Sequence, residues 1–165
     1  MIDFGTYARG LLELTEFAIK NNEIDKFLLG EPPYAYRDRW SSATAPNDVT
    51  TIFSAGIRPY AVLHPEAKIK EKIEDLIPVL STTTDGLDVL VSILFTETYA
   101  RSEGRTSLGI NLENLSQILR KQVAKHADLL RQTFERGGLT NPEGLYGDFK
   151  RLSKTIAKHG GPEFI

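Results

Sequence analysis

The chain has 165 residues, of which 41% are hydrophobic and 25% are charged, so wholesale disorder is not expected. Its net charge of −2 argues against nucleic acid as the default partner, because a backbone-binding protein needs a concentrated positive field. The absence of cysteine excludes disulfides, thiolate metal sites and a cysteine nucleophile, and it fits a cytoplasmic protein.

The charge is unevenly distributed along the chain. Residues 1–110 hold 16 Asp and Glu against 11 Lys and Arg (−5), whereas residues 111–165 hold 6 against 9 (+3). The amino-terminal sequence has acids within its apolar part and no basic region before it, so we expect no signal peptide. The longest apolar run, LDVLVSILF, is far shorter than the roughly 20 residues that cross a bilayer, so we expect a soluble protein.

The first two elements are predicted helices. Over residues 4–22, one stripe at helical spacing is formed by Tyr7, Leu11, Leu14 and Ala18, with Phe17 beside it. A short second helix over residues 23–29 is expected to stop at Gly30, because two prolines follow.

Residues 31–63 lack a clear period. AYRDRW alternates loosely like a strand and DVTTIF is rich in β-branched residues, but Asn47–Asp48 can also cap a helix that ends near Gly56 or Pro59. We predict irregular structure followed by a helix. A long irregular loop is uncommon in a compact domain and tends to be functional where it occurs.

Regular helical spacing returns at residue 64. Pro65 suits a first helical turn, Pro78 is expected to bend or end the helix, and the apolar stripe is Ile69, Ile73, Leu76, Ile77 and Leu80. The next helix is expected to start at Thr84 or Asp85 and to close at Gly104. Its apolar residues surround it between Leu87 and Phe95, which is typical of a buried central helix.

Two amphipathic helices complete the chain. The first is capped by Asn111, ends at Gly137 and carries the stripe Leu112, Leu115, Leu119, Val123, Leu130 and Phe134. The second begins at Asn141–Pro142, ends at Gly160–Gly161 and carries Leu145, Phe149, Leu152 and Ile156. The sequence therefore predicts an all-α, single-domain helical bundle over residues 1–165, with about six helices and one long irregular segment near residues 30–60.

The sequence contains no motif for catalysis, metal binding or phosphate binding. His64, His126 and His159 are favoured as capping or packing residues, because none has a second ligand at helical spacing. Asp85 and Asp88 suit the first turn of a helix, where negative charge is stabilised. Glu97 can pair with Arg101 four residues on. We expect no catalytic residue, no cofactor and no metal, and therefore not an enzyme.

One stretch, EPPYAYRDRWSSA, concentrates the residue types that dominate protein–protein hot spots, in Tyr34, Tyr36, Arg37, Arg39 and Trp40. Alternatively, Trp40 and one tyrosine anchor this loop to the helices. The basic residues of the carboxyl-terminal part alternate with acids, which favours solvated helix faces over a phosphate-binding track. The track would comprise Arg120, Lys121, Lys125, Arg131, Arg136, Lys150, Arg151, Lys154 and Lys158.

Two segments, LLELTEFAIKNNEIDKFL and DGLDVLVSILFTETYARSEG followed by INLENLSQILRKQVAKHADLL, resemble small α-helical immunity proteins of bacterial polymorphic-toxin and contact-dependent growth inhibition systems. The resemblance implies a cytoplasmic protein without activity of its own that binds and neutralises one cognate toxin domain. An acidic surface on residues 1–110 would complement a basic toxin. We assign to partner binding the five loop residues Tyr34, Tyr36, Arg37, Arg39 and Trp40, together with Asp85, Asp88 and Glu97.

Two other interpretations of the sequence stay open. One is a helical enzyme in which Asp88, Glu97 and His126 converge across neighbouring helices. The other is a nucleic-acid-associated regulator that uses residues 111–158. The first requires a polar pocket, and the second requires salt-dependent binding of DNA or RNA.

Overall fold

A computed structural model describes residues 4–31, 49–135 and 142–165 of the chain. The described residues are mainly helical and contain no β-strand, which confirms the predicted all-α fold class. The chain divides into two compact units, Met1–Leu76 and Ile77–Ile165. The expectation of a single domain stays a prediction. Among the described helices, none combines the length and apolar character needed to cross a membrane.

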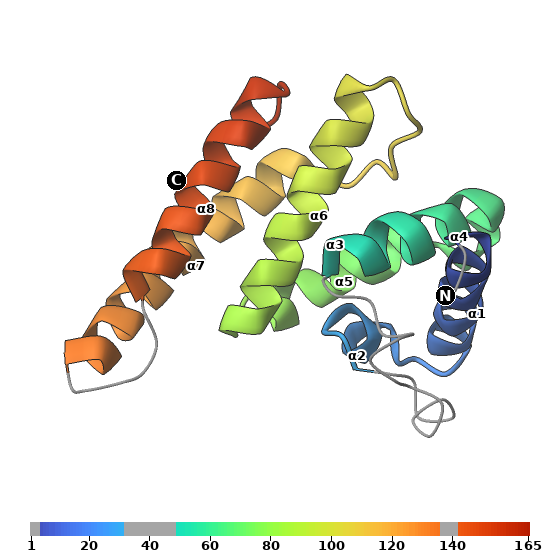
Figure 1. Ribbon diagram of the computed structural model, residues 1–165, viewed down its shortest axis with the longest axis horizontal. Helices are drawn as coiled ribbons and strands as arrows, with labels where there is room; N and C mark the ends of the chain where they lie inside the picture. Colours follow the sequence, from blue (N-terminus) through green and yellow to red (C-terminus); the bar gives the residue numbers. More distant parts are fainter. Residues whose placement is uncertain (1–3, 32–48, 136–141) are drawn as a thin grey trace. The chain divides into compact units, whose positions relative to one another are not determined.

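The first unit begins with α1 (Phe4–Lys20) and α2 (Ile24–Leu28), drawn in blue in Figure 1. Within the predicted stripe of α1, Leu11, Leu14 and Ala18 are buried. The short helix α2 buries Ile24, Phe27 and Leu28. It is followed by Gly30 at a φ of 83°, a left-handed conformation that glycine adopts without steric cost.

Residues 49–63 form one continuous helix, where the sequence predicts irregular structure followed by a helix. It consists of α3 (Val49–Ile52), the π-helical turn η2 (Phe53–Ile57) and α4 (Arg58–Leu63). The wide turn precedes Pro59, which has no N–H to donate and whose ring crowds the carbonyl one turn back. The irregular segment predicted near residues 30–60 is therefore too long, and residues 32–48 lie outside the described residues.

The π-helical turn lies against α1. Gly56 permits this close approach, because a Cβ there would lie 2.9 Å from Thr15 Oγ1. Phe53 and Ile57 are fully buried on either side of it. The turn thus supplies two large apolar side chains to the core of the first unit.

Two helical segments follow, where the sequence predicts one helix that opens at Pro65. The 3₁₀ turn η3 (Pro65–Ala67) is separated from α5 (Ile69–Leu80) by Lys68, whose φ of 52° is incompatible with a continuous helix. The predicted α5 stripe is buried at Ile69, Ile73, Ile77 and Leu80. Pro78 lies inside α5 on its exposed side, and the helix continues two residues beyond it.

In the second unit, α6 (Thr84–Ser102), α7 (Leu112–Glu135) and α8 (Pro142–Lys158) pack against one another, and Figure 1 shows α8 alongside α7. Buried apolar side chains surround α6, as predicted for a central helix, at Leu87, Val89, Leu90, Val91, Ile93 and Leu94. Thr83 is the N-cap, in place of the expected Thr84 or Asp85, and its hydroxyl accepts a hydrogen bond from the Gly86 N–H at 2.9 Å.

The last two helices agree with most of the described part of their predicted stripes, whereas the side chains of Leu130, Phe134 and Leu145 lie outside those that the structure describes. Asn111 caps α7 as expected, because its Oδ1 accepts a hydrogen bond from the Asn114 N–H at 3.0 Å. In α8, Phe149, Ser153 and Ile156 are buried, so Ser153 takes the buried position that the sequence gives to Leu152. The reason is that Phe164 folds back onto α8, where its N–H donates to Ser153 Oγ at 3.0 Å.

Candidate functional site

The main predicted binding residues fall in the segment that follows α2 in the sequence. Tyr34, Tyr36, Arg37, Arg39 and Trp40 lie outside the described residues. Their assignment to partner binding therefore stays a prediction, and so does the alternative in which Trp40 anchors the loop.

Two further predicted residues, Asp85 and Asp88, are exposed near the amino-terminal end of α6. Negative charge is stabilised there by the unpaired N–H groups of the first turn. Behind them, the backbone of α6 touches the end of α5, because a Cβ on Gly86 would overlap the carbonyl oxygen of Leu80. The two carboxylates thus occupy a firmly packed helix end that is open to solvent.

Glu97, the third predicted acid, lies in the interior of the second unit. Its side chain is fully buried. Its Oε2 accepts hydrogen bonds from Ser107 Oγ at 2.8 Å and from the Leu108 N–H at 3.0 Å. A buried carboxylate needs such donors, because desolvation without them is costly. Because a fully buried side chain does not contact a partner protein, Glu97 is not part of the binding surface.

Glu97 and Arg101, which both lie on α6, form hydrogen bonds with the connection between α6 and α7. Arg101 Nε donates to Ser107 Oγ at 3.0 Å, and its NH2 group donates to the Ile110 carbonyl at 2.9 Å. The sequence predicts a direct pair between Glu97 and Arg101, whereas the structure joins both of them to Ser107. No periodic pattern signals this role for Ser107, because a polar connection contains no repeat.

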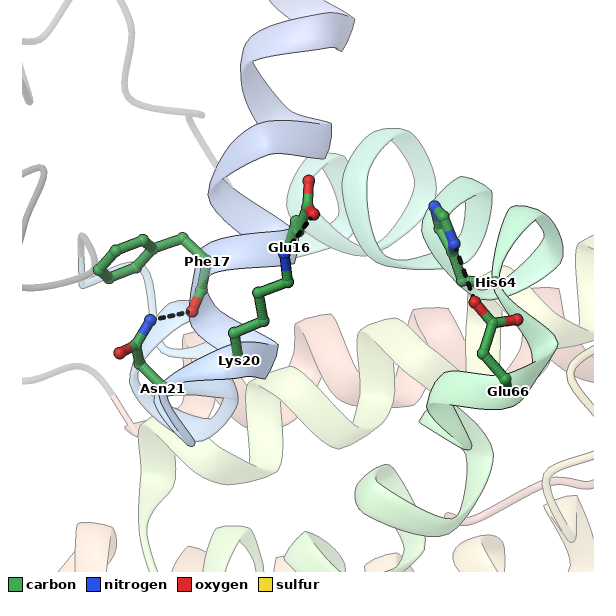
Figure 2. Close-up of polar contacts among 6 residues, drawn as sticks. All are labelled: Glu16, Phe17, Lys20, Asn21, His64 and Glu66. Atoms are coloured by element: carbon green, nitrogen blue, oxygen red, sulfur yellow. Dashed lines mark hydrogen bonds and ion pairs between the residues drawn. The ribbon is translucent and has the colours of Figure 1, made fainter.

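The first unit carries a second group of polar residues, on α1 and at the end of α4. Figure 2 shows Lys20 and Glu16 on α1, with Lys20 Nζ 2.7 Å from Glu16 Oε1. At the end of α4, His64 Nδ1 lies 3.1 Å from Glu66 Oε1. The His64 ring also packs on Tyr60, with ring centroids 4.5 Å apart. Together these residues form one exposed ion pair, between Lys20 and Glu16, and one hydrogen bond, between His64 and Glu66, near the ring of Tyr60.

The titration of these groups reflects their pairing. The hydrogen bond from Lys20 lowers the pKa of the Glu16 carboxyl, and the same bond raises the pKa of Lys20. The pKa of Glu66 is lowered by its own backbone N–H and then by the hydrogen bond with His64. Both carboxylates therefore stay ionised to lower pH than free side chains.

Two large apolar side chains immediately precede His64 and face solvent. Val62 is 51% exposed and Leu63 is 65% exposed. We call the six residues Glu16, Lys20, Val62, Leu63, His64 and Glu66 the α1–α4 surface. The sequence signal for it is weak, because Val62 and Leu63 end a helix whose π-helical turn and proline hide its period. An exposed apolar pair, in the same unit as these charged groups and directly before His64 in the chain, supplies the residue types of a small protein-interaction surface.

The three histidines fall in different surroundings. His64 lies between α4 and η3 and packs on the Tyr60 ring, which is one of its two expected roles, whereas its side chain makes no capping hydrogen bond at the start of η3. His159 follows α8 and contacts the edge of the Tyr99 ring, with centroids 5.2 Å apart. The side chain of His126 lies outside those that the structure describes. No cluster of three or more potential metal ligands occurs among the described residues.

The helical geometry of α6 separates the two carboxylates of the enzyme interpretation. Glu97 lies nine positions after Asp88, which is two and a half turns at about 100° per residue. The two side chains therefore project from opposite sides of α6, and Asp88 is exposed whereas Glu97 is buried. They do not converge in one polar pocket.

Comparison with known proteins gives no match for this chain among protein families, curated proteins or solved structures.

Proposed function

We propose that the protein is an immunity protein that binds one cognate bacterial toxin domain in the cytoplasm and neutralises it, with no catalytic activity of its own. The observation that carries the proposal is the exposed pair Val62 and Leu63 on the α1–α4 surface. Large apolar side chains at the end of a packed helix favour contact with another protein, because burying them removes apolar area from water.

The charged residues of the α1–α4 surface support the same function. Lys20 forms an ion pair with Glu16, and the Glu66 carboxylate forms a hydrogen bond with His64. Such intramolecular contacts restrict the side chains, and restricted side chains lose less conformational freedom when they bind. A polar rim of this kind supplies orientation and specificity, and the apolar pair supplies the buried contact.

The sequence adds two further reasons. The helical segments over residues 11–28 and 85–130 resemble small immunity proteins, and the predicted loop with Tyr34, Tyr36 and Trp40 supplies the residue types of hot spots. Asp85 and Asp88 add exposed negative charge suited to a basic toxin surface. Blocking an active site by binding alone requires no catalytic group in the inhibitor.

The proposal predicts that a toxin-like domain is encoded immediately upstream of this chain's gene, and it is tested with that domain. We expect the two proteins to co-purify, and we expect cells that express the toxin domain to grow only when this chain is co-expressed. The idea is rejected if no complex forms and no protection is seen with that domain.

The contribution of the α1–α4 surface is measured separately. The double substitution Val62→Ser with Leu63→Ser should weaken the complex by about 2 kcal/mol or more if the pair is a hot spot. Val79→Ser is a matched control, because Val79 is 61% exposed and lies outside this surface. Equal affinities for the double variant and the control would place the toxin contact elsewhere on the chain.

A further inference from the structure

The exposed face of α8 between residues 149 and 158 is entirely basic. The buried residues of this stretch are Phe149, Ser153 and Ile156, which fix the helix face that meets the core. The exposed side chains on the other face are Lys150, Arg151, Lys154 and Lys158. Every exposed position of this stretch therefore carries a positive charge, with no acid between them.

Three of these residues follow one another along α8, with a rotation of about 40° around the helix axis at each step. Lys150, Lys154 and Lys158 recur every four residues, so they follow one another at about 6 Å along the helix and span about 12 Å. None of the three forms an ion pair with another residue in the part of the chain that the structure describes. We call Lys150, Lys154 and Lys158 the α8 lysine row.

Two other helices of the protein place opposite charges at the same four-residue spacing. Glu16 and Lys20 on α1 are oppositely charged and lie 2.7 Å apart, and Lys70 and Glu74 on α5 lie 3.7 Å apart. Opposite charges at this spacing stabilise a helix, whereas like charges destabilise it. The α8 lysine row thus contains two such unfavourable pairs, Lys150 with Lys154 and Lys154 with Lys158. A bound polyanion would relieve their repulsion.

The chemistry of this face selects the kind of polyanion. Protein interfaces are depleted in lysine and rely on apolar and aromatic residues, which are missing from the exposed positions of this stretch. Binders of single-stranded nucleic acid stack bases on aromatic side chains. Regularly spaced ammonium groups without either feature suit a regular array of phosphates.

We propose that the α8 lysine row binds the phosphate backbone of a nucleic-acid duplex. This activity is separate from toxin neutralisation and does not depend on it. Because the net charge of the chain is −2, the attraction has to come from a local concentration of positive charge, which this face supplies. Contacts to phosphates carry no base information, so binding is expected to show no sequence preference.

The test measures binding of the full chain to two fluorescent 20-base-pair DNA duplexes of unrelated sequence, by anisotropy at several salt concentrations. Three lysines that each neutralise a phosphate give a slope of about −2.7 in a plot of log K against log salt concentration. The affinity should therefore fall about 40-fold between 50 and 200 mM salt, equally for both duplexes.

Substitutions assign the binding to α8. The triple variant Lys150→Gln, Lys154→Gln and Lys158→Gln should reduce the magnitude of the slope by about 2.7 and weaken binding at least about tenfold in 50 mM salt. A charge-matched control replaces Lys26, Lys70 and Lys72 of the first unit by glutamine and should bind like the unaltered protein. Circular dichroism establishes that both variants are folded.

Three results would overturn the proposal. The first is an unaltered protein that fails to bind duplex at 50 mM salt. The second is a folded triple variant that binds as tightly as the control. The third is binding of poly-glutamate in preference to duplex, which would assign the α8 lysine row to an acidic protein partner.

Discussion

A hydrogen bond of 2.8 Å joins the buried carboxylate of Glu97 to the hydroxyl of Ser107, which lies ten residues further along the chain. The Ser107 oxygen also accepts hydrogen bonds from Arg101 Nε at 3.0 Å and from the Gly109 N–H at 3.1 Å. One serine therefore connects a buried acid, an arginine and the backbone of the same connection. These hydrogen bonds order the chain between α6 and α7, in which Ile110 is also buried.

Replacing Glu97 by alanine should destabilise the second unit. The Ser107 hydroxyl and the Leu108 N–H would lose their acceptor, at a cost of about 1–3 kcal/mol in the free energy of unfolding. Urea denaturation measures this loss. Hydrogen exchange at the Leu108 amide, which donates to Glu97 at 3.0 Å, should accelerate as well. Glu113→Ala on exposed α7 is the control, and an equal effect of both substitutions would contradict this role for Glu97.

Replacing Gly86 and Gly10 by alanine should change the free energy of unfolding in opposite directions. In Gly86→Ala the new Cβ would overlap the Leu80 carbonyl, so we expect a loss of about 1–3 kcal/mol or more in unfolding free energy. Gly10 lies within α1, and a Cβ there meets nothing within 4 Å. Gly10→Ala should therefore stabilise the protein by about 0.5–1 kcal/mol. Thermal denaturation of the two variants checks the signs, and a stable Gly86→Ala protein would argue against the tight approach of α5 and α6.

Helices with a continuous apolar stripe could be predicted from the sequence. Leu112, Leu115, Leu119 and Val123 are buried on α7, and Asn111 caps it, as the spacing indicates. The helix over residues 49–63 was harder to predict, because Pro59 and the β-branched Val49 and Thr50 all lower helix propensity. Burial of Phe53 and Ile57 against α1 outweighs that propensity.

The candidate site was predictable only in part, because side-chain burial depends on partners that no local pattern identifies. Asp85 and Asp88 are exposed at a helix start, as their position indicates. Glu97 is buried because a serine and a backbone N–H from the following connection reach it. The exposure of Val62 and Leu63 follows from where α4 ends, which is set by His64 and the turn at Pro65.

The ion pair on α1 predicts a change in titration. Because pairing lowers the pKa of Glu16, its stabilisation is complete above the ordinary carboxyl pKa of about 4.3 and is lost as the pH falls through the lowered value. Pairing also raises the pKa of Lys20. The stabilisation that depends on the charged Lys20 is therefore lost only as the pH rises through this raised pKa. In Lys20→Met, NMR should show the pKa of the Glu16 carboxyl rising toward the ordinary value.

Glu66 is the internal control for this titration. Its pKa is lowered by its own backbone N–H and by His64, so Lys20→Met should leave it unchanged. A Glu16 titration that is identical in the two proteins would show that the pair does not persist in solution.

The final prediction separates two roles for the loop that contains Trp40. If the loop contacts the toxin domain, alanine at Tyr34, Tyr36 or Arg37 should weaken the complex by about 2 kcal/mol at a hot-spot position while leaving the free energy of unfolding unchanged. If Trp40 instead anchors the loop to the helices, Trp40→Ala should lower unfolding stability by about 3–5 kcal/mol, as expected for truncating a buried aromatic side chain. Calorimetric binding and urea denaturation on the same four variants distinguish these outcomes. A residue that faces the partner should change the affinity and leave the free energy of unfolding unchanged. Unchanged affinity in all three variants at Tyr34, Tyr36 and Arg37 would indicate that the toxin domain contacts the α1–α4 surface instead.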